Sequence, residues 1–288
     1  MKLVTYTYQG RTSIGKVVGN LVIDIAQAYE GAPKTVLEIL RGGQEVLERL
    51  DAVQPPTASS VSLSEVKLEA PVQGVQKFLA IGLNYQDHVE EIIKRGGKGP
   101  EHQMWFNKNV SCITGPYDPI NLPRVSTALD YEGELGVVIG RRCKNVSEGD
   151  ALASVGGYLV VDDVTCRDWQ RKTTQWTLGK SFDTHGPIGP WLVTPDEVPD
   201  PQALEMRLFV NGELRQKTST GGMVYSIAQQ ISYLSSVMTL EPGDIIATGT
   251  CSGAGFGFSP PRFLQVGDVV RVEIDGIGHI ENKVVAEE

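Results

Sequence analysis

One stretch of the chain, residues 129–140, constrains the fold more than any other. Apolar residues recur at alternate positions along it, which is the periodicity of a β-strand. On such a strand Glu132 and Glu134 share one face with Gly136, while Leu135 lies on the other face with further apolar residues. The apolar run is typical of a strand covered on both sides. The glycines beyond the two acids leave room for something to approach that face.

A third acid joins the two glutamates. Asp163 lies at the end of a second apolar stretch, at 157–164, that also predicts a strand. Ionised carboxylates are costly to bury together unless a cation or hydrogen bonds compensate. A ligand set of carboxylates without paired His or Cys favours a hard cation, and leaves positions open for water and substrate. These residues predict Mg²⁺ or Mn²⁺ ahead of Ca²⁺, with solvated acids as the competing interpretation.

Composition excludes several classes of protein. The 288 residues are 41% hydrophobic and 21% charged, as in an ordinary globular protein with one or two domains. The net charge of −9 disfavours nucleic acid as a partner. No apolar run approaches the roughly 18 residues of a membrane span, and the first residues alternate like a strand rather than a signal peptide. We expect a cytoplasmic protein with no membrane partner, whose four cysteines, lacking a CxxC pair, are free thiols.

The first part of the chain predicts a small domain. Residues 3–8 and the segments around Gly19-Asn20 are expected to form strands, and the helical periodicity of 35–50 is interrupted at Gly42-Gly43. Residues 54–60 have the composition of a linker. We therefore place a small N-terminal domain at 1–70 and a second domain at 71–288.

The second domain is expected to be rich in strands. A buried strand at 77–82 leads into a short helix, and the glycines at 95–100 after that helix suggest the hinge of a lid within 88–105. Asn211-Gly212 is typical of a tight hairpin turn, and Ser226 with Gln229 predicts a capping box that opens a helix. Further strands are predicted at 244–248, 269–274 and 279–285, so the fold class is α+β.

Several other groups of residues suggest chemistry. His88 and Glu91 are three apart, so on a helix they share a face and are placed to activate water, although on spacing alone a surface pair is the favoured interpretation. Arg167 and Gln170 suit a substrate carboxylate, with a surface role as the alternative. The glycine-rich segment 249–257 lacks the following helix of a dinucleotide site, but its backbone N–H groups could line a pocket.

A nucleotide-binding loop is excluded at a second place in the chain. Gly179-Lys180-Ser181 has the end of a Walker sequence, but Thr174 stands where that sequence requires its first glycine. We therefore expect no ATP site there.

Six motifs between residues 77 and 285 together resemble the fumarylacetoacetate hydrolase family. They are Ile81 to His88 (IGLNYQDH), Phe106-Asn107-Lys108, Asp130 to Leu135 (DYEGEL), Asp163 to Gln170 (DVTCRDWQ), Gly179 to Asp183 (GKSFD), and Pro242 to Thr250. The resemblance implies a mixed β-sandwich roll with a small N-terminal domain, and a homodimer.

The resemblance also implies roles for individual residues. It implies that Glu132, Glu134 and Asp163 bind the metal, and that His88 and Glu91 form a catalytic dyad. Substrate contacts are implied for a further set, of which Lys180 is also catalytic: Arg167, Gln170, Lys180, Gly249 and Thr250.

The reaction that we expect is hydrolysis of a carbon–carbon bond in a 1,3-diketo acid such as an acylpyruvate, through a metal-stabilised enolate. Decarboxylation of an oxaloacetate-type acid, tautomerisation and isomerisation would use the same metal site, and a protein that only binds a metal or metabolite is the non-enzymatic alternative. Asp162 stands where many members have Asn, and Cys251 where a Pro commonly follows Gly-Thr. These departures leave the substrate open.

Overall fold

The computed structural model describes residues 1–53 and 59–288, and its largest element is a twelve-stranded mixed sheet. Its strands are β1 (Lys2–Tyr8), β2 (Arg11–Val18), β3 (Leu21–Asp24), β4 (Ser60–Ser62), β5 (Lys67–Leu68), β6 (Phe78–Gly82), β7 (Met104–Lys108), β8 (Ile113–Thr114), β11 (Gly133–Ile139), β12 (Val155–Asp162), β14 (Gly186–Val193) and β17 (Ile245–Ala247). Their order is β4-β3-β2-β1-β14-β12-β11-β17-β6-β7, with β5 beside β1 and β8 beside β14.

A second sheet packs against the first. Its order is β16-β15-β18-β19-β9, and its strands are β9 (Ile120–Leu122), β15 (Glu205–Val210), β16 (Glu213–Ser219), β18 (Val269–Ile274) and β19 (Gly278–Ala286). A short ribbon pairs β10 (Leu129–Asp130) with β13 (Thr165–Cys166). The helices are α1 (Val36–Asp51), α2 (Gln86–Lys94), α3 (Glu148–Ala151), α4 (Arg167–Gln170) and α5 (Ile227–Val237). The strand-rich α+β class and the mixed sandwich are thus confirmed.

The strand β11 is buried on both faces. On one face Leu135 packs with Leu208 of β15 and with Val272 of β18, in the core between the two sheets. On the other face Val138 belongs to a second core, which includes Ile39 of α1. The prediction of a strand covered on both sides is therefore confirmed, and burial of apolar side chains on each face fixes the register of β11.

Gly136 in β11 and Gly140 just after it are closely approached by β12. A Cβ atom added to Gly136 would lie 2.4 Å from a methyl carbon of Leu159 and 2.7 Å from one of Val161, both on β12. At Gly140 the added atom would meet the Cα of Gly156 at 2.4 Å. The room that these glycines leave is therefore used to pack β12 against β11.

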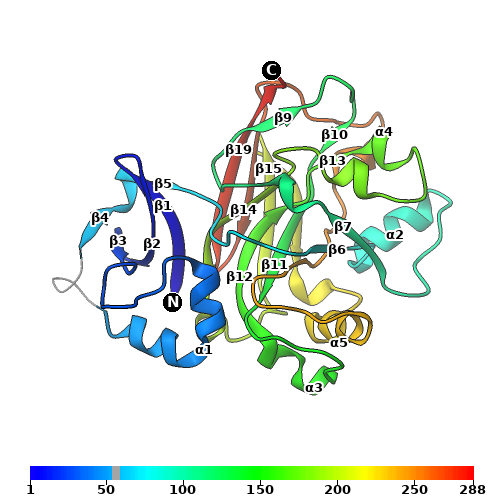
Figure 1. Cartoon of the computed structure of the whole chain (residues 1–288). Helices are drawn as coiled ribbons and strands as arrows, with labels where there is room; N and C mark the ends of the chain where they lie inside the picture. Colours follow the sequence, from blue (N-terminus) through cyan, green and yellow to red (C-terminus); the bar gives the residue numbers. More distant parts are fainter. Residues whose placement is uncertain (54–58) are drawn as a thin grey trace.

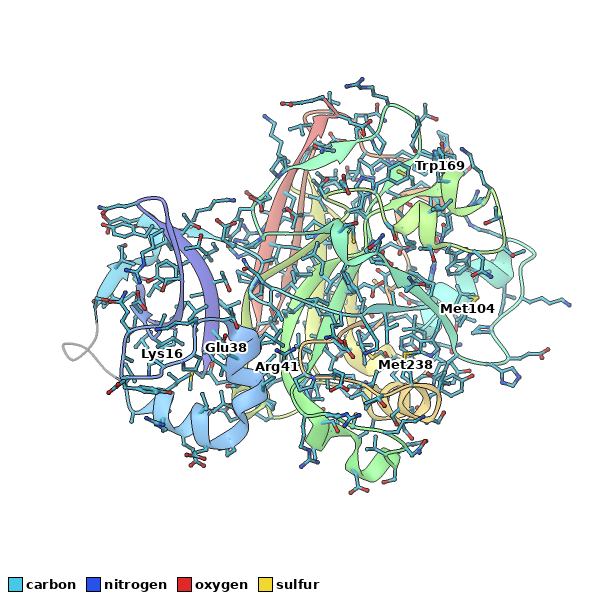
Figure 2. The ribbon with its side chains drawn as sticks, in the orientation of Figure 1. Lys16, Glu38, Arg41, Met104, Trp169 and Met238 are labelled. Carbon is cyan, nitrogen blue, oxygen red and sulfur yellow. The ribbon has the colours of Figure 1, made fainter. Side chains whose placement is uncertain are left out.

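The N-terminal strands extend the main sheet. Lys2 and Leu3 of β1 pair with Val193 and Leu192 of β14, and Figure 1 shows this part and α1 on the opposite side of the molecule from α2 and α4. Lys16 on β2 is buried beside α1 (Figure 2), where its Nζ donates to two carbonyl oxygens of the last turn at 2.9 Å each. A cation at that end also complements the helix dipole. The predicted linker lies, over residues 54–58, outside the described residues.

Local signals in the sequence produced the structures they predict. Asn211 and Gly212 both have positive φ, of 51° and 79°, and connect β15 to β16. Ser226 and Gln229 form the capping box of α5. Gly43 interrupts α1 with a φ of 65°. The four cysteines are buried and free. In the described part of the chain, no helix has the length and apolarity that a bilayer span requires.

Candidate active site

The antiparallel pairing of β11 with β12 brings the three acids together. Gly133 lies opposite Asp162 in this ladder, so the start of β11 is next to the end of β12. Asp163 donates its backbone N–H to the carbonyl of Glu132 at 2.9 Å, and Glu132 donates its own to Asp162 Oδ1 at 2.9 Å. Residues thirty positions apart in the sequence therefore lie side by side because of strand register.

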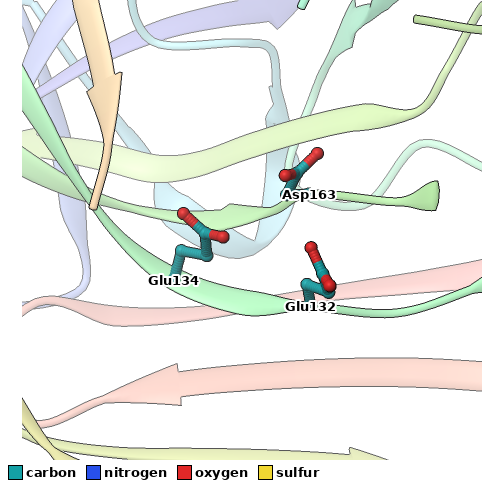
Figure 3. A group of neighbouring side chains, drawn as sticks. All are labelled: Glu132, Glu134 and Asp163. Atoms are coloured by element: carbon teal, nitrogen blue, oxygen red, sulfur yellow. The ribbon is translucent and has the colours of Figure 1, made fainter. Parts of the chain in front are cut away.

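Glu132, Glu134 and Asp163 form a buried cluster of carboxylates (Figure 3). Each offers one oxygen such that all three oxygens lie within 4.8 Å of one another. Burial raises the pKa of Glu134 well above its ordinary value, and the charges of Asp163 and Glu132 add to this. Burial also acts to raise the pKa of Glu132, but Arg167 and Lys180 outweigh it and lower that pKa to about 2. The pKa values of Glu132 and Glu134 are therefore shifted in opposite directions.

Three basic side chains surround the acids. Lys180 Nζ lies 2.5 Å from Glu132 Oε2 and 2.6 Å from Asp163 Oδ2. Arg167 donates from Nη2 to Glu132 Oε1 at 2.5 Å and from Nη1 to Gln170 Oε1 at 3.1 Å. The fully buried Lys108 lies 2.7 Å from Asp163 Oδ1. The structure therefore brings together Arg167, Gln170 and Lys180 with the acids, as the family resemblance implied.

The carboxylate of Glu134 is the member of the cluster that lacks a counter-ion. Its Oε2 accepts the backbone N–H of Gly249 at 2.7 Å, and in the residues that the structure describes no basic side chain forms an ion pair with it. An ionised carboxylate that is buried without a basic partner is costly, and a cation from outside the chain would offset that cost. With oxygen as the only donor element, these three residues fit a hard divalent cation such as Mg²⁺ or Mn²⁺.

His88 and Glu91 lie within hydrogen-bond distance on α2, and the surface pair that their spacing alone favoured is wrong, because His88 is buried. His88 is buried, and its Nδ1 lies 3.1 Å from Glu91 Oε2. If Nδ1 carries the hydrogen that this carboxylate accepts, the lone pair of Nε2 is available as a base. His88 also contacts the edge of Phe256, with ring centroids 5.8 Å apart. Phe256 also lies under the guanidinium of Arg167, whose carbon is 4.3 Å from the ring centroid.

The helix α2 is fastened to the glycine-rich segment 249–257. Asp87 Oδ2 accepts from Ser252 Oγ at 2.8 Å and from its backbone N–H at 3.3 Å. At the other end of the helix, Arg95 donates to the carbonyl of Phe256 at 3.0 Å and to that of Gly257. These bonds fix the dyad relative to the loop that carries Phe256.

Three backbone N–H groups of the glycine-rich segment are bound by carboxylates of the protein. Gly249 donates to Glu134, while Gly255 and Phe256 donate to the two oxygens of Asp130 at 2.7 and 3.0 Å. Thr250 does line the pocket, but its hydroxyl donates to the carbonyl of Gly133 at 2.8 Å. These donors are used because the loop closes over buried carboxylates whose acceptor oxygens need partners.

A cavity of about 400 Å³ extends from His88 to Glu132 and Glu134. It is lined by His88, Glu132, Glu134, Arg167, Gln170, Lys180 and Thr250 together with Ile81, Gly82, Leu83, Ile92, Phe106, Arg171, Thr173, Trp176 and Phe256. A site of this size suits a small metabolite.

Sequence reasoning gave no role to three residues that shape this site. Asp130 forms an ion pair with Arg167 at 2.8 Å, Lys108 forms one with Asp163, and Phe256 contacts both His88 and Arg167. Asp130 could have been found as an acid two positions before Glu132 in a buried strand. Lys108 could have been found as a charged residue after an apolar strand. The role of Phe256 depends on tertiary contacts alone.

Comparison with known proteins places this site in a family. The family model described as fumarylacetoacetate (FAA) hydrolase C-terminal matches residues 77–285. A Burkholderia cenocepacia protein, whose name proposes a hydrolase without a substrate, is 51% identical over 234 residues, which cover 81% of this chain and 82% of its own length. The chain belongs to the fumarylacetoacetate hydrolase family.

Two solved structures cover this chain and their own chains completely. Maleylpyruvate hydrolase from Sphingobium sp. SYK-6, solved with manganese(II) and pyruvate, has a TM-score of 0.84 and 33% identity. The 5-carboxymethyl-2-hydroxymuconate delta-isomerase from Mycobacterium smegmatis has a TM-score of 0.79 and 33% identity. These neighbours are enzymes of two reaction types, so the likeness supports an enzyme here, and the manganese complex together with the buried acids supports a divalent metal.

Proposed function

We propose that this protein hydrolyses a carbon–carbon bond in a 1,3-diketo acid of the acylpyruvate type. The observation that carries the proposal is one pocket in which His88, paired with Glu91, and the carboxylates of Glu132 and Glu134 line the same cavity. A water-activating base and a cation site are the two parts that such a hydrolysis needs. The hydrolase among the structural neighbours supports the same assignment.

A divalent cation held by Glu132, Glu134 and Asp163 would supply Lewis acidity toward the carboxylate and adjacent keto oxygen of the substrate. Arg167 and Gln170 would bind the substrate oxygens from the neighbouring wall. Lys180, already beside Glu132 and Asp163, would add positive charge where the enolate develops.

His88 moves the protons of the reaction. Its Nε2 accepts a proton from water as the oxygen adds to the distal carbonyl, and Glu91 stabilises the imidazolium that results. The carbon–carbon bond then breaks, and its electron pair stays on the pyruvate fragment as an enolate. The imidazolium returns the proton to the enolate carbon, so one water and one diketo acid give one carboxylic acid and pyruvate.

Product analysis tests this proposal. Acylpyruvates incubated with the protein and Mn²⁺ or Mg²⁺ are expected to give pyruvate and the matching carboxylic acid in equal amounts, and EDTA should stop the reaction. Carbon dioxide released from oxaloacetate without hydrolysis of any diketo acid would instead assign a decarboxylase.

A double-bond isomerase is the second candidate, because the isomerase from Mycobacterium smegmatis shares the fold over the whole chain. That reaction needs proton transfer but no attacking water. Isomerisation of an unsaturated oxo acid without fragmentation would therefore replace the hydrolase assignment. The homodimer implied by the family resemblance belongs to the same proposal, and sedimentation equilibrium measures it.

A further inference from the structure

We propose that the pocket selects substrates with an uncharged apolar or aromatic acyl group, and that Trp176 and Phe106 are the residues that select it. With Leu83 and Ile92 they form what we call the acyl wall of the pocket. The inference rests on the proposed function, because it names the group beyond the second carbonyl of the same substrate.

The indole of Trp176 occupies the space that a side chain at Gly82 would fill. A Cβ atom added to Gly82 would lie 2.6 Å from Cζ3 of Trp176 and 3.0 Å from its Cη2. The indole therefore rests directly on the backbone of β6. It also packs on Phe106 of the adjacent strand β7, with ring centroids 5.4 Å apart and planes tilted by 59°. Two rings fixed in this way present a rigid apolar surface.

Leu83 and Ile92 continue this surface from two other directions. Leu83 has a φ of 55°, in the left-handed region that a leucine adopts only under constraint. The next residue supplies that constraint, since Asn84 is fully buried and donates from Nδ2 to the carbonyl of Thr248 at 2.8 Å. Ile92 is four positions after His88 on α2, so it lies on the same helix face one turn beyond the base.

One basic side chain of the pocket approaches the acyl wall, because Lys180 Nζ lies 4.9 Å from the ring centroid of Phe106. Arg167 and Lys180 are already bound to the carboxylates of Glu132, Asp130 and Asp163. Arg171 is the remaining basic residue that lines the pocket, and it is exposed. A second carboxylate at the far end of a substrate would have only this solvated arginine as a partner, whereas an apolar group would be removed from water by four side chains.

The test compares ligands that differ only at the far end. With Mn²⁺ present, kcat/KM is measured for three substrates. They are hexanoylpyruvate, acetylpyruvate, and an acylpyruvate of the same length as hexanoylpyruvate that ends in a carboxylate. In parallel, binding of 2-oxooctanoate and 2-oxooctanedioate to the Mn²⁺-loaded protein is measured by calorimetry. The wild-type protein is expected to favour the hexanoyl over the acetyl substrate by about fourfold for each methylene buried, and to bind 2-oxooctanoate more tightly than the dicarboxylate.

Two variants locate the preference. Trp176→Leu is expected to lower kcat/KM for hexanoylpyruvate by about tenfold or more while acetylpyruvate changes by less than about twofold. Trp191→Leu, a half-buried tryptophan outside this pocket, should leave both values unchanged. Arg171→Gln should leave the preference for the apolar ligand in place.

Failure of this inference and failure of the proposed function give different results. Suppose that diketo acids are turned over, that the substrate with a terminal carboxylate is used as well as or better than hexanoylpyruvate, and that Arg171→Gln loses this preference. That result would overturn the apolar subsite and keep the hydrolase. Tighter binding of 2-oxooctanoate that is lost in Trp176→Leu, without turnover of any acylpyruvate, would support the subsite and reject the hydrolase.

Discussion

Asp130 and Arg167 form a buried ion pair in which Asp130 Oδ2 accepts from Arg167 Nε at 2.8 Å. The same carboxylate accepts the backbone N–H groups of Gly255 and Phe256. Burial acts to lower the pKa of Arg167, but Glu132 and Asp130 outweigh it and raise that pKa. One acid outside the metal cluster therefore fixes the charged arginine and the loop that bears Phe256.

Replacing Asp130 is expected to weaken the positioning of both Arg167 and the loop that bears Phe256. In Asp130→Asn one of the two carboxylate oxygens is replaced by an NH₂ group, which cannot accept a hydrogen bond. A buried donor therefore loses its acceptor, at a cost of about 1–3 kcal/mol in unfolding free energy. We also expect KM for a diketo acid to rise more than kcat falls, because Arg167 binds substrate oxygens. Chemical denaturation and steady-state kinetics measure the two effects. Asp275→Asn, on the surface, is the control, and equal behaviour of the two variants would contradict the role of Asp130.

Glu132 and Glu134, at the start of β11, should respond oppositely to neutralisation. Glu134→Gln is expected to abolish Mn²⁺ binding while the unfolding free energy in EDTA stays equal or rises, because the pKa of Glu134 is raised by burial and by its acidic neighbours. Glu132→Gln should lose about 3 kcal/mol, because it removes a charge that Arg167 and Lys180 share. Calorimetric titration and denaturation in EDTA provide the measurements. A loss of stability in Glu134→Gln as large as that in Glu132→Gln would refute the distinction.

The dyad separates catalysis from metal binding. His88→Asn is expected to lower kcat by about 10²- to 10⁴-fold, the usual contribution of general base catalysis, with Mn²⁺ affinity unchanged. Glu91→Gln keeps the hydrogen bond to Nδ1 but loses the charge that stabilises the imidazolium, so its loss should be smaller. Turnover of His88→Asn equal to that of the wild-type protein would remove His88 from the mechanism.

His185 makes the fold sensitive to acid. Burial lowers its pKa from 6.5 to about 3, against the opposing effect of the Asn121 carbonyl, with Lys108 adding to the decrease. Between pH 6.5 and 3 the imidazole of His185 is therefore protonated in the unfolded chain and neutral in the folded chain. Stability from this group is present above pH 6.5 and is lost as pH falls toward 3, by up to about 1.4 kcal/mol per pH unit.

The variant His185→Gln isolates this dependence. The glutamine can still donate to the Asn121 carbonyl, which His185 Nε2 contacts at 2.9 Å, but it does not titrate. Its unfolding free energy should fall less steeply between pH 6.5 and 4 than that of the wild-type protein. His102→Gln is the exposed control. Parallel curves for the wild-type protein and His185→Gln would show that His185 does not titrate on unfolding.

Much of the local structure followed from residues close together in the sequence. Asn211-Gly212 formed its turn, Ser226 capped its helix, and Gly43 interrupted α1. The strand β14 was not predicted, because Pro187 and Pro190 lack the N–H group that a central strand uses. It nevertheless lies between β1 and β12, and β1 pairs with it at residues 192 and 193, after both prolines.

The sequence by itself determined that Glu132 and Glu134 would lie near one another, because a strand fixes the faces of residues two positions apart. The end of a second predicted strand added Asp163, and helical spacing added the pair of His88 and Glu91, while the resemblance to a family implied their roles. Only the tertiary structure decided how the charges are shared. Strand register set Glu132 beside Asp163, and long-range contacts brought Lys180 and Arg167 to Glu132, while no ion pair within the described residues involves Glu134. Such long-range contacts depend on the packing of the whole sandwich, and no local pattern of residues encodes them.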